Sequence, residues 1–212
     1  MIEGECLIYI VDDDQRICEA LCNLLEANGI PSRSFNSIGE YSRFNRPNVA
    51  GCLLLDINLP EISGLEFQSQ SDRETHPPIV FVTGNGDIPS SVRAMKHGAV
   101  DFLTKPFEHK DLINAVHTAI EQDRLRRAQQ AELTTLKTRL STLTPREREV
   151  LPFVISGLLN KQAAAKLGIS EVTFQIHRSK VMQKMQATSV AQLVRIAEKL
   201  QIPMHSANHI AR

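Results

Sequence analysis

The chain has no tryptophan, no Cys-x-x-Cys pair and no run of about 18 apolar residues. Without such a run it is not expected to be a membrane protein, and two acids within Met1–Glu5 are unlike a secretory signal. A hydrophobic share of 42%, with ten glycines and ten prolines among 212 residues, excludes a disordered or fibrous chain. The four cysteines resemble reduced core residues, which predicts a cytoplasmic protein. They are Cys6, Cys18, Cys22 and Cys52.

Net charge is also absent, because 24 Lys and Arg balance 24 Asp and Glu. The balance hides an asymmetry along the chain. Residues 1–121 hold 18 acidic and 9 basic side chains, a difference of −9. Residues 122–212 hold 6 acidic and 15 basic side chains, a difference of +9. This pattern indicates two parts with different roles, the second of them near a polyanion.

The first half alternates apolar strands with amphipathic helices. The runs Leu53–Leu55 and Ile79–Val82 are continuously apolar, as is typical of strands buried on both faces. The alternation predicts an α/β fold with a doubly wound, five-stranded parallel sheet, in which chemistry gathers at the carboxyl ends of the strands. We expect strands at 7–11, 32–35, 52–56, 79–82 and 101–104, and helices near 14–27, 37–45, 64–71 and 90–98.

Polar side chains follow four of these strands. Asp12 and Asp13 follow the first and Asp56 ends the third, whereas Thr83 and Lys105 follow the fourth and fifth. Three carboxylates at one edge repel each other unless they share a cation, and hard oxygen ligands suit Mg²⁺. A carboxylate beside Mg²⁺ can attack a phosphoryl group, while a hydroxyl and an ammonium group take up the added oxygens and charge. Taken singly, an acid at a strand end is more often a helix cap, so the interpretation depends on all five groups occurring together in this order.

Residues 122–139 form a long polar stretch without glycine or proline, which predicts a helix. Leu133, Leu136, Leu140 and Leu143 are spaced by three, four and three residues, as in a coiled coil. Two heptads do not establish pairing between chains. A coiled coil and a linker helix packed on a neighbouring domain are therefore both open.

The last part of the chain is helical and contains a helix-turn-helix pattern. Thr144–Glu147 has the residues of a capping box, and Gly168–Ser170 separates a helix at 161–167 from one at 171–185. Side chains on the outer face of the second helix could read base edges, and lysines could neutralise phosphates. The candidates for bases are Gln175, Ile176 and Ser179, and those for phosphates are Lys161, Lys166, Lys180 and Lys184.

Four motifs in the first half resemble a response-regulator receiver domain over about residues 5–122. They are Val11-Asp12-Asp13, Asp56-Ile57-Asn58-Leu59-Pro60 with Gly64, Val82-Thr83-Gly84, and Lys105-Pro106-Phe107. The resemblance implies that Asp56 accepts a phosphoryl group from a sensor histidine kinase. It also implies Mg²⁺ bound by Asp13, Asp56 and the backbone carbonyl of Asn58, with Asp12 assisting through water.

The same resemblance assigns roles to the other motif residues. Thr83 and Lys105 would contact the phosphoryl oxygens, and Phe102 would be the switch aromatic that moves inward together with Thr83. The bond between Lys105 and Pro106 would be cis, an isomer that is accessible to X-Pro bonds.

The second half resembles the LuxR-type DNA-binding domain over residues 141–205. The motifs are Leu143–Leu151, Gly157–Lys161, Leu167–Ser170, Thr173 and His177-Arg178, although Phe174 stands where that family usually has valine. The resemblance implies that 171–185 is the recognition helix and that dimers bind two half-sites. It also adds Thr173 to the expected DNA contacts.

Together these features predict a response regulator of the FixJ/NarL type with a receiver at 1–122, a helical linker at 123–142 and a DNA-binding domain at 143–205. We expect a regulator and not an enzyme, with promoter DNA, RNA polymerase and a second copy of the phosphorylated chain as partners. An aspartate-nucleophile phosphohydrolase would need a second carboxylate where Asn58 stands. A nucleotide-binding regulator would need a glycine-rich loop after the first strand. A receiver that acts without phosphate is the remaining alternative.

Overall fold

The computed structural model describes residues 6–72, 75–84 and 87–203. The first five residues of the predicted receiver and the last two of the predicted DNA-binding domain lie outside these ranges. The chain divides into two compact units, Met1–Arg127 and Ala128–Arg212. Each unit has its own hydrophobic core.

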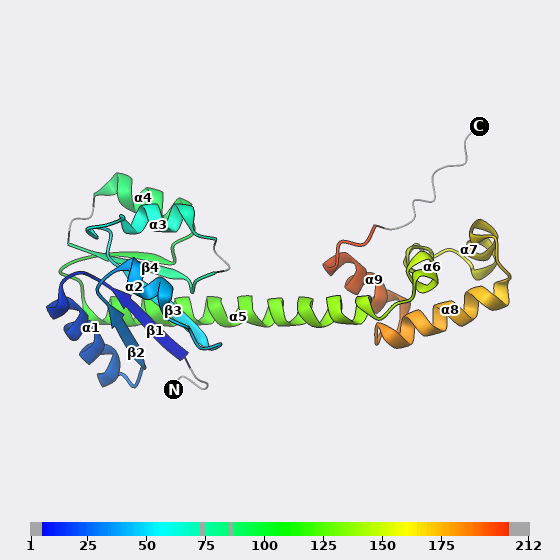
Figure 1. The fold of residues 1–212 in the computed structure, drawn as a ribbon, viewed down its shortest axis with the longest axis horizontal. Coiled ribbons are helices and arrows are strands. Elements are labelled where there is room, and N and C mark those ends of the chain that lie inside the picture. Colours follow the sequence, from blue (N-terminus) through cyan, green and yellow to red (C-terminus); the bar gives the residue numbers. More distant parts are fainter. Residues whose placement is uncertain (1–5, 73–74, 85–86, 204–212) are drawn as a thin grey trace. The chain divides into compact units, whose positions relative to one another are not determined.

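The first unit alternates strands and helices around a parallel sheet (Figure 1). The strand order is β2-β1-β3-β4-β5, and every neighbouring pair is parallel. The predicted doubly wound fold is therefore confirmed. Its strands are β1 (Cys6–Val11), β2 (Ser32–Phe35), β3 (Ala50–Leu55), β4 (Ile79–Thr83) and β5 (Asp101–Thr104), and its helices are α1 (Gln15–Ala27), α2 (Ile38–Arg43), α3 (Gly64–Gln70), α4 (Ile88–Lys96) and the first part of α5 (His109–Ser141).

Both faces of the sheet are covered, because successive side chains of a strand point to opposite sides. On β1, Ile8 and Ile10 pack with α1 and α5, whereas Tyr9 and Val11 pack with α2, α3 and α4. All four side chains are at most 2% exposed. The continuous apolar runs seen in the sequence arise from this double burial.

The helix α5 is a single helix of 33 residues. Its leucines at 136 and 140, together with Leu143, pack into the core of the second unit, and Leu136 and Leu143 are each 4% exposed. These side chains therefore already have partners within the same chain. This arrangement favours a linker helix packed on a neighbouring domain over a coiled coil.

A buried carboxylate ties part of α5 to the sheet. Asp123 is 0% exposed, and its Oδ2 accepts hydrogen bonds from the backbone N–H of Gly51 at 3.0 Å and from Nε of Arg127 at 2.7 Å. Its other oxygen pairs with Arg126. Arg127 also donates to Oδ1 of Asn48 at 2.6 Å. Residues 123–127 consequently belong to the first unit, which extends past the predicted receiver boundary at residue 122.

The second unit is helical after α5. Thr144 caps α6 through the predicted capping box with Glu147. Phe174 is 1% exposed and lies in the core, so this unit accommodates the larger ring. No helix of the described residues is long and apolar enough to cross a membrane. The helices are α6 (Pro145–Ile155), α7 (Asn160–Leu167), α8 (Glu171–Lys184) and α9 (Val190–Lys199).

Candidate functional site

The carboxyl ends of β1 and β3 bring two acids together. The strands are neighbours, with Val11 opposite Leu55. Asp12 and Asp56 are the next residue on each strand, and the backbone N–H of Asp56 donates to the carbonyl of Val11 at 2.9 Å. Both acids are buried, at 3% and 7% exposure. The sheet topology thus places two carboxylates side by side, as the sequence predicts.

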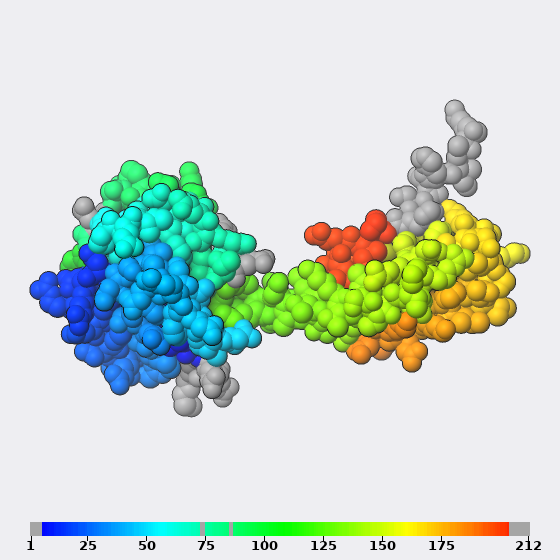
Figure 2. Space-filling model, in the orientation of Figure 1, coloured from blue at the N-terminus to red at the C-terminus, as the bar shows by residue number. Residues whose placement is uncertain are grey.

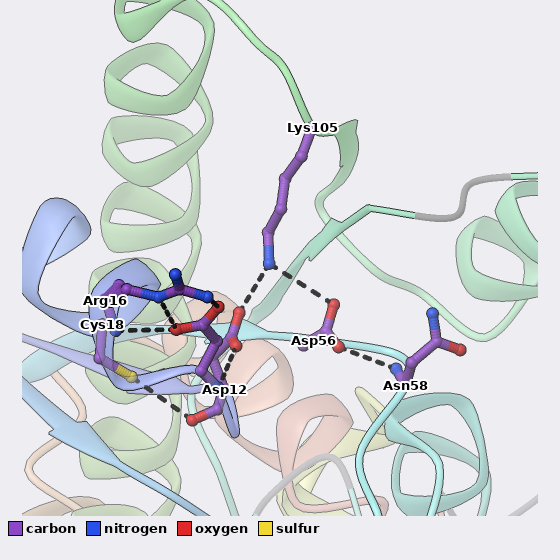
Figure 3. A network of polar contacts seen from close by, with 7 residues as sticks. Asp12, Arg16, Cys18, Asp56, Asn58 and Lys105 are labelled. Carbon is purple, nitrogen blue, oxygen red and sulfur yellow. Dashed lines mark hydrogen bonds and ion pairs between the residues drawn. The ribbon is translucent and has the colours of Figure 1, made fainter.

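Lys105 supplies the positive charge between them. Its Nζ lies 2.7 Å from Oδ2 of Asp12 and 3.8 Å from Oδ1 of Asp56. Figure 3 shows the lysine side chain extending from the end of β5 toward both carboxylates. The bond between Lys105 and Pro106 is cis, as the sequence resemblance implies. The ammonium group can therefore contact a group attached to Asp56 without leaving the site.

The pKa of Asp56 is raised above its ordinary value. Burial is the largest cause, and the negative charge of Asp12 adds to it, whereas the Lys105 ammonium group acts in the opposite direction. The backbone N–H of Asn58 donates to Oδ2 of Asp56 at 3.0 Å, which favours the carboxylate. Asp56 is thus held in a site that penalises its charge and where added positive charge is favourable.

Thr83 and Phe102 lie on β4 and β5, the two strands that follow β3 in the sheet. Thr83 ends β4, is 0% exposed and accepts a hydrogen bond from the backbone N–H of Lys105 at 2.7 Å through its carbonyl. Phe102 on β5 is half-buried, and its ring centre lies 6.2 Å from that of Phe81. The carbonyl link couples the position of Thr83 to the segment that carries Lys105.

The oxygen donors at this edge fit a small hard cation. Asp13 and Asn58 are exposed beside the buried Asp12 and Asp56, and carboxylate and carbonyl oxygens are the ligands that Mg²⁺ prefers. Among the described residues, no three His, Cys, Asp or Glu side chains already converge as a metal site. One oxygen of Asp12 is held by Lys105, and burial raises the pKa of Asp56, so a cation beside Asp56 would stabilise its charged form.

Sequence reasoning did not place Cys18 at this site. The thiol of Cys18 on α1 donates to the backbone carbonyl of Asp12 at 3.4 Å, and burial raises the pKa of this thiol to about 11. The thiol is therefore protonated at neutral pH and acts as a hydrogen-bond donor that supports the segment after β1. The only sequence signal was its place on the apolar face of the first helix.

In the second unit, a glycine and a capping serine fix the turn between α7 and α8. Gly168 ends α7 in the left-handed region, with φ of 65°, a conformation that glycine adopts at little cost. Ser170 then caps α8, because its side chain accepts a hydrogen bond from the backbone N–H of Thr173 at 3.1 Å. The predicted turn between two helices is confirmed by this geometry.

One side of α8 is exposed and the other is buried. Phe174 and Val181 point into the core. The outer side forms part of the surface of the second unit, where the helix is coloured yellow to orange in Figure 2. The exposed residues include four of the predicted DNA contacts and one that was not predicted, Val172. The four are Gln175, Ile176, Ser179 and Lys180.

Three other polar side chains of α8 have partners inside the domain. The hydroxyl of Thr173 lies 2.7 Å from that of Ser170, so it contributes to the helix cap. Arg178 donates to Oδ1 of Asn160 at 2.6 Å. Lys184 donates to Oε2 of Glu147 at 2.7 Å. A helical wheel can place Arg178 toward the domain, but it cannot name the partners of Arg178 and Lys184, because Asn160 and Glu147 lie on other helices.

Two protein families match the chain in the same order as the two units. The response regulator receiver domain matches residues 8–117, and the luxR family of bacterial regulatory proteins matches residues 141–197. Nodulation protein W of Bradyrhizobium diazoefficiens is 46% identical over 206 residues, which cover 97% of this chain and 89% of the relative. Response regulator protein TmoT of Ectopseudomonas mendocina is 41% identical, with coverage of 94% and 91%.

Solved structures agree with these matches. The response regulator StyR has a TM-score of 0.81 and 42% identity, with coverage of 92% of this chain and 100% of that one. Full-length FixJ from B. japonicum has a TM-score of 0.53 and 35% identity, with coverage of 95% and 99%. The parallel sheet and the helix-turn-helix are thus matched, in this order, by one known family along almost the whole chain. The chain is a two-component response regulator with a LuxR-type DNA-binding domain, a transcription regulator and not an enzyme.

Proposed function

We propose that the chain is switched by transfer of a phosphoryl group to Asp56 from a histidine kinase. The observation that carries this proposal is the position of Lys105, whose ammonium group lies between the buried carboxylates of Asp12 and Asp56. A receiver implies a histidine kinase as partner, and the helix-turn-helix implies DNA binding. Response regulators are typically cytoplasmic, so the phosphoryl transfer and the DNA binding would both take place in the cytoplasm.

The transfer is a nucleophilic substitution at phosphorus. A carboxylate oxygen of Asp56 forms the new P–O bond while the P–N bond to the kinase histidine breaks, and the imidazole nitrogen keeps the electron pair and takes up a proton. Lys105 neutralises charge on the phosphoryl oxygens, a role that its 3.8 Å distance from Oδ1 of Asp56 supports. Thr83 would bond another phosphoryl oxygen through its hydroxyl group, with Phe102 moving inward.

Receivers of this family generally use Mg²⁺ for phosphorylation. We propose that Asp13, Asp56 and the carbonyl of Asn58 hold the ion directly and that Asp12 assists through water. When bound, Mg²⁺ supplies positive charge to the transferred oxygens. In this arrangement the residue Asp12 positions both the ion and Lys105.

Phosphorylation would act through assembly of two receivers. Ile88, Val92 and Met95 lie on α4 and are 79%, 45% and 47% exposed. Their spacing of four and three residues places them on one side of the helix. An apolar surface of this kind supports a dimer of phosphorylated receivers. The dimer would contact DNA with two copies of α8. RNA polymerase would then meet the DNA-bound regulator.

DNA contact would come from the exposed side of α8. Gln175, Ile176 and Ser179 would meet base edges, with Lys161 and Lys180 on phosphates. Thr173 and Lys184 were expected to contact DNA as well. Their partners within the domain support positioning roles instead.

Sedimentation with a phosphoryl mimic tests the switch. The full chain is sedimented with Mg²⁺, with and without beryllofluoride, and Asp56→Asn is the control. We expect the unmodified chain to shift from monomer to dimer and the variant to stay a monomer. If neither responds, labelling of Asp56 by a small phosphodonor separates phosphorylation without dimerisation from a receiver that acts without phosphate.

The phosphohydrolase alternative has its own test. Asn58 stands where such enzymes need an acidic residue, and it is exposed. Restoring an acid with Asn58→Asp should not produce multiple turnovers of a phosphate ester. Sustained release of phosphate by this variant would favour the phosphohydrolase alternative.

A further inference from the structure

Two exposed aliphatic side chains lie on the same side of α8. Val172 is 66% exposed and Ile176 is 51% exposed, although the helix buries Phe174 and Val181 on its other side. Residues four apart on a helix have Cβ atoms about 5–6 Å apart. The pair therefore forms one continuous apolar surface that the core of the domain does not use.

The local physics of the helix gives no reason for these residues. Valine and isoleucine are poorer helix formers than alanine, glutamate or lysine, because a β-branched side chain loses rotamer freedom in a helix. Two adjacent exposed apolar side chains are too few to establish a binding surface by themselves, so their position on the helix and the surrounding charge carry the argument. Val172 is the second residue of α8, two positions after the cap at Ser170, and the first turn of a recognition helix meets base edges.

The charge around the pair identifies the other molecule. Residues 122–212 carry an excess of nine basic side chains, from 15 basic and 6 acidic. Lys161 and Lys180 are exposed, and neither forms an ion pair with another described residue. Such a surface favours a polyanion. In the major groove of DNA, the apolar group that base edges offer is the 5-methyl group of thymine.

We propose that Val172, together with Ile176, recognises thymine methyl groups in the target DNA. Val172 is thus a specificity-determining residue that adds a second apolar contact, four residues before the first. The neighbouring exposed Gln175 and Ser179 supply polar contacts to the same stretch of bases. The inference rests on DNA binding by α8 and adds which base feature the helix selects.

Removal of single methyl groups from the DNA tests this directly. Duplexes are first selected from a randomised library with the full chain, Mg²⁺ and beryllofluoride, and each thymine of the selected site is then replaced in turn by deoxyuridine. We expect the unmodified chain to bind about fourfold more weakly for each contacted methyl group removed. Val172→Ala should abolish this penalty at one thymine of each half-site, and Ile176→Ala should abolish it at another.

Controls separate this contact from general weakening. Leu125→Ala removes an aliphatic side chain that is 64% exposed on α5 and should leave the deoxyuridine penalty unchanged. Val172→Thr keeps the branched shape with one methyl group fewer and should retain part of the penalty. The proposal is overturned if Val172→Ala keeps the full penalty at every thymine, as a protein partner for this surface would require. If the unmodified chain enriches no sequence, DNA binding itself fails.

Discussion

The ammonium group of Lys184 lies 2.7 Å from a carboxylate oxygen of Glu147, which is 37 residues earlier in the chain. Glu147 is 2% exposed and also accepts a hydrogen bond from the backbone N–H of Thr144. Lys184 is therefore part of the connection between α6 and α8. A second bond from Lys184 to the carbonyl of Thr142, at 3.1 Å, extends this connection to the end of α5.

This pairing predicts different results for two lysines of α8. Lys184→Met should leave the dependence of DNA affinity on salt almost unchanged and lower the melting temperature of the domain, by roughly 4–8 °C for a loss of about 1 kcal/mol. Lys180→Met should reduce the slope of log affinity against log salt by about 0.9 for each phosphate that is no longer neutralised. Binding isotherms at several salt concentrations give both slopes. Equal slopes for the two variants would contradict the assignment.

The pH dependence of stability reports on Asp56. Because burial raises its pKa in the folded state, the folded chain holds this proton more tightly than the unfolded chain. Deprotonation of Asp56 therefore destabilises the fold as the pH rises from the ordinary pKa through the raised one. Asp56→Asn removes this effect, so the unfolding free energy of the variant relative to the unmodified chain should grow across that pH range and level off above the raised pKa. Urea unfolding at a series of pH values measures it, and a gap that shrinks with pH would reverse the sign.

A glycine fixes the backbone behind Asp56. A Cβ atom on Gly64 would overlap the carbonyl oxygen of Asp56. Gly64→Ala should therefore lower stability by about 1–3 kcal/mol and slow phosphorylation, because the strain displaces Asp56. Gly39→Ala is the matched control, since its Cβ would have ordinary contacts of 3.7 Å or more and alanine favours a helix. Equal stability of the two variants would show that the loop adapts.

The buried Asp123 predicts a large effect on stability from a residue outside the Asp12–Asp56–Lys105 cluster. Asp123→Ala leaves the N–H of Gly51 without its acceptor and removes the buried carboxylate that pairs with Arg126 and Arg127, so we expect a loss of about 3 kcal/mol. Tyrosine fluorescence during denaturation isolates the receiver, because both tyrosines of the chain, Tyr9 and Tyr41, lie in its core.

The control for this substitution lies on the same helix. Glu121 pairs with Arg124, but the glutamate side chain is 64% exposed. Glu121→Gln should cost less than about 0.5 kcal/mol, because surface ion pairs contribute little. A similar loss for both variants would show that the burial of Asp123 has no special weight.

The sheet and the acid pair followed from local patterns. Strands that are buried on both faces have continuous apolar sequences. In a parallel sheet the carboxyl ends of the strands lie at one edge, independently of the loop conformations. The positions of Asp12, Asp56 and Lys105 could therefore be predicted before any contact was known. The same holds for the turn between α7 and α8, because Gly168 and Ser170 act within a few residues of themselves.

The missed contacts join residues that are distant in sequence. Asp123 lies in a polar helix, and the sequence alone predicts a solvent-exposed charge there. Its carboxylate is instead buried and accepts a hydrogen bond from Gly51, 72 residues away. A helical wheel likewise describes only α8, so it cannot show that Lys184 pairs with Glu147 on α6. Such pairs depend on tertiary packing, which periodicity within one element does not encode.

The helix α5 has a practical consequence for the exchange of domains between regulators. Residues up to 127 belong to the first compact unit and those from 128 belong to the second, yet His109–Ser141 contains neither glycine nor proline. A gene fusion made inside this stretch must continue the helix across the junction, because the sequence offers no turn or cap there. Chimeras should therefore keep α5 whole from one parent and repair the opposite contact surface, either around Gly51 or around Leu136.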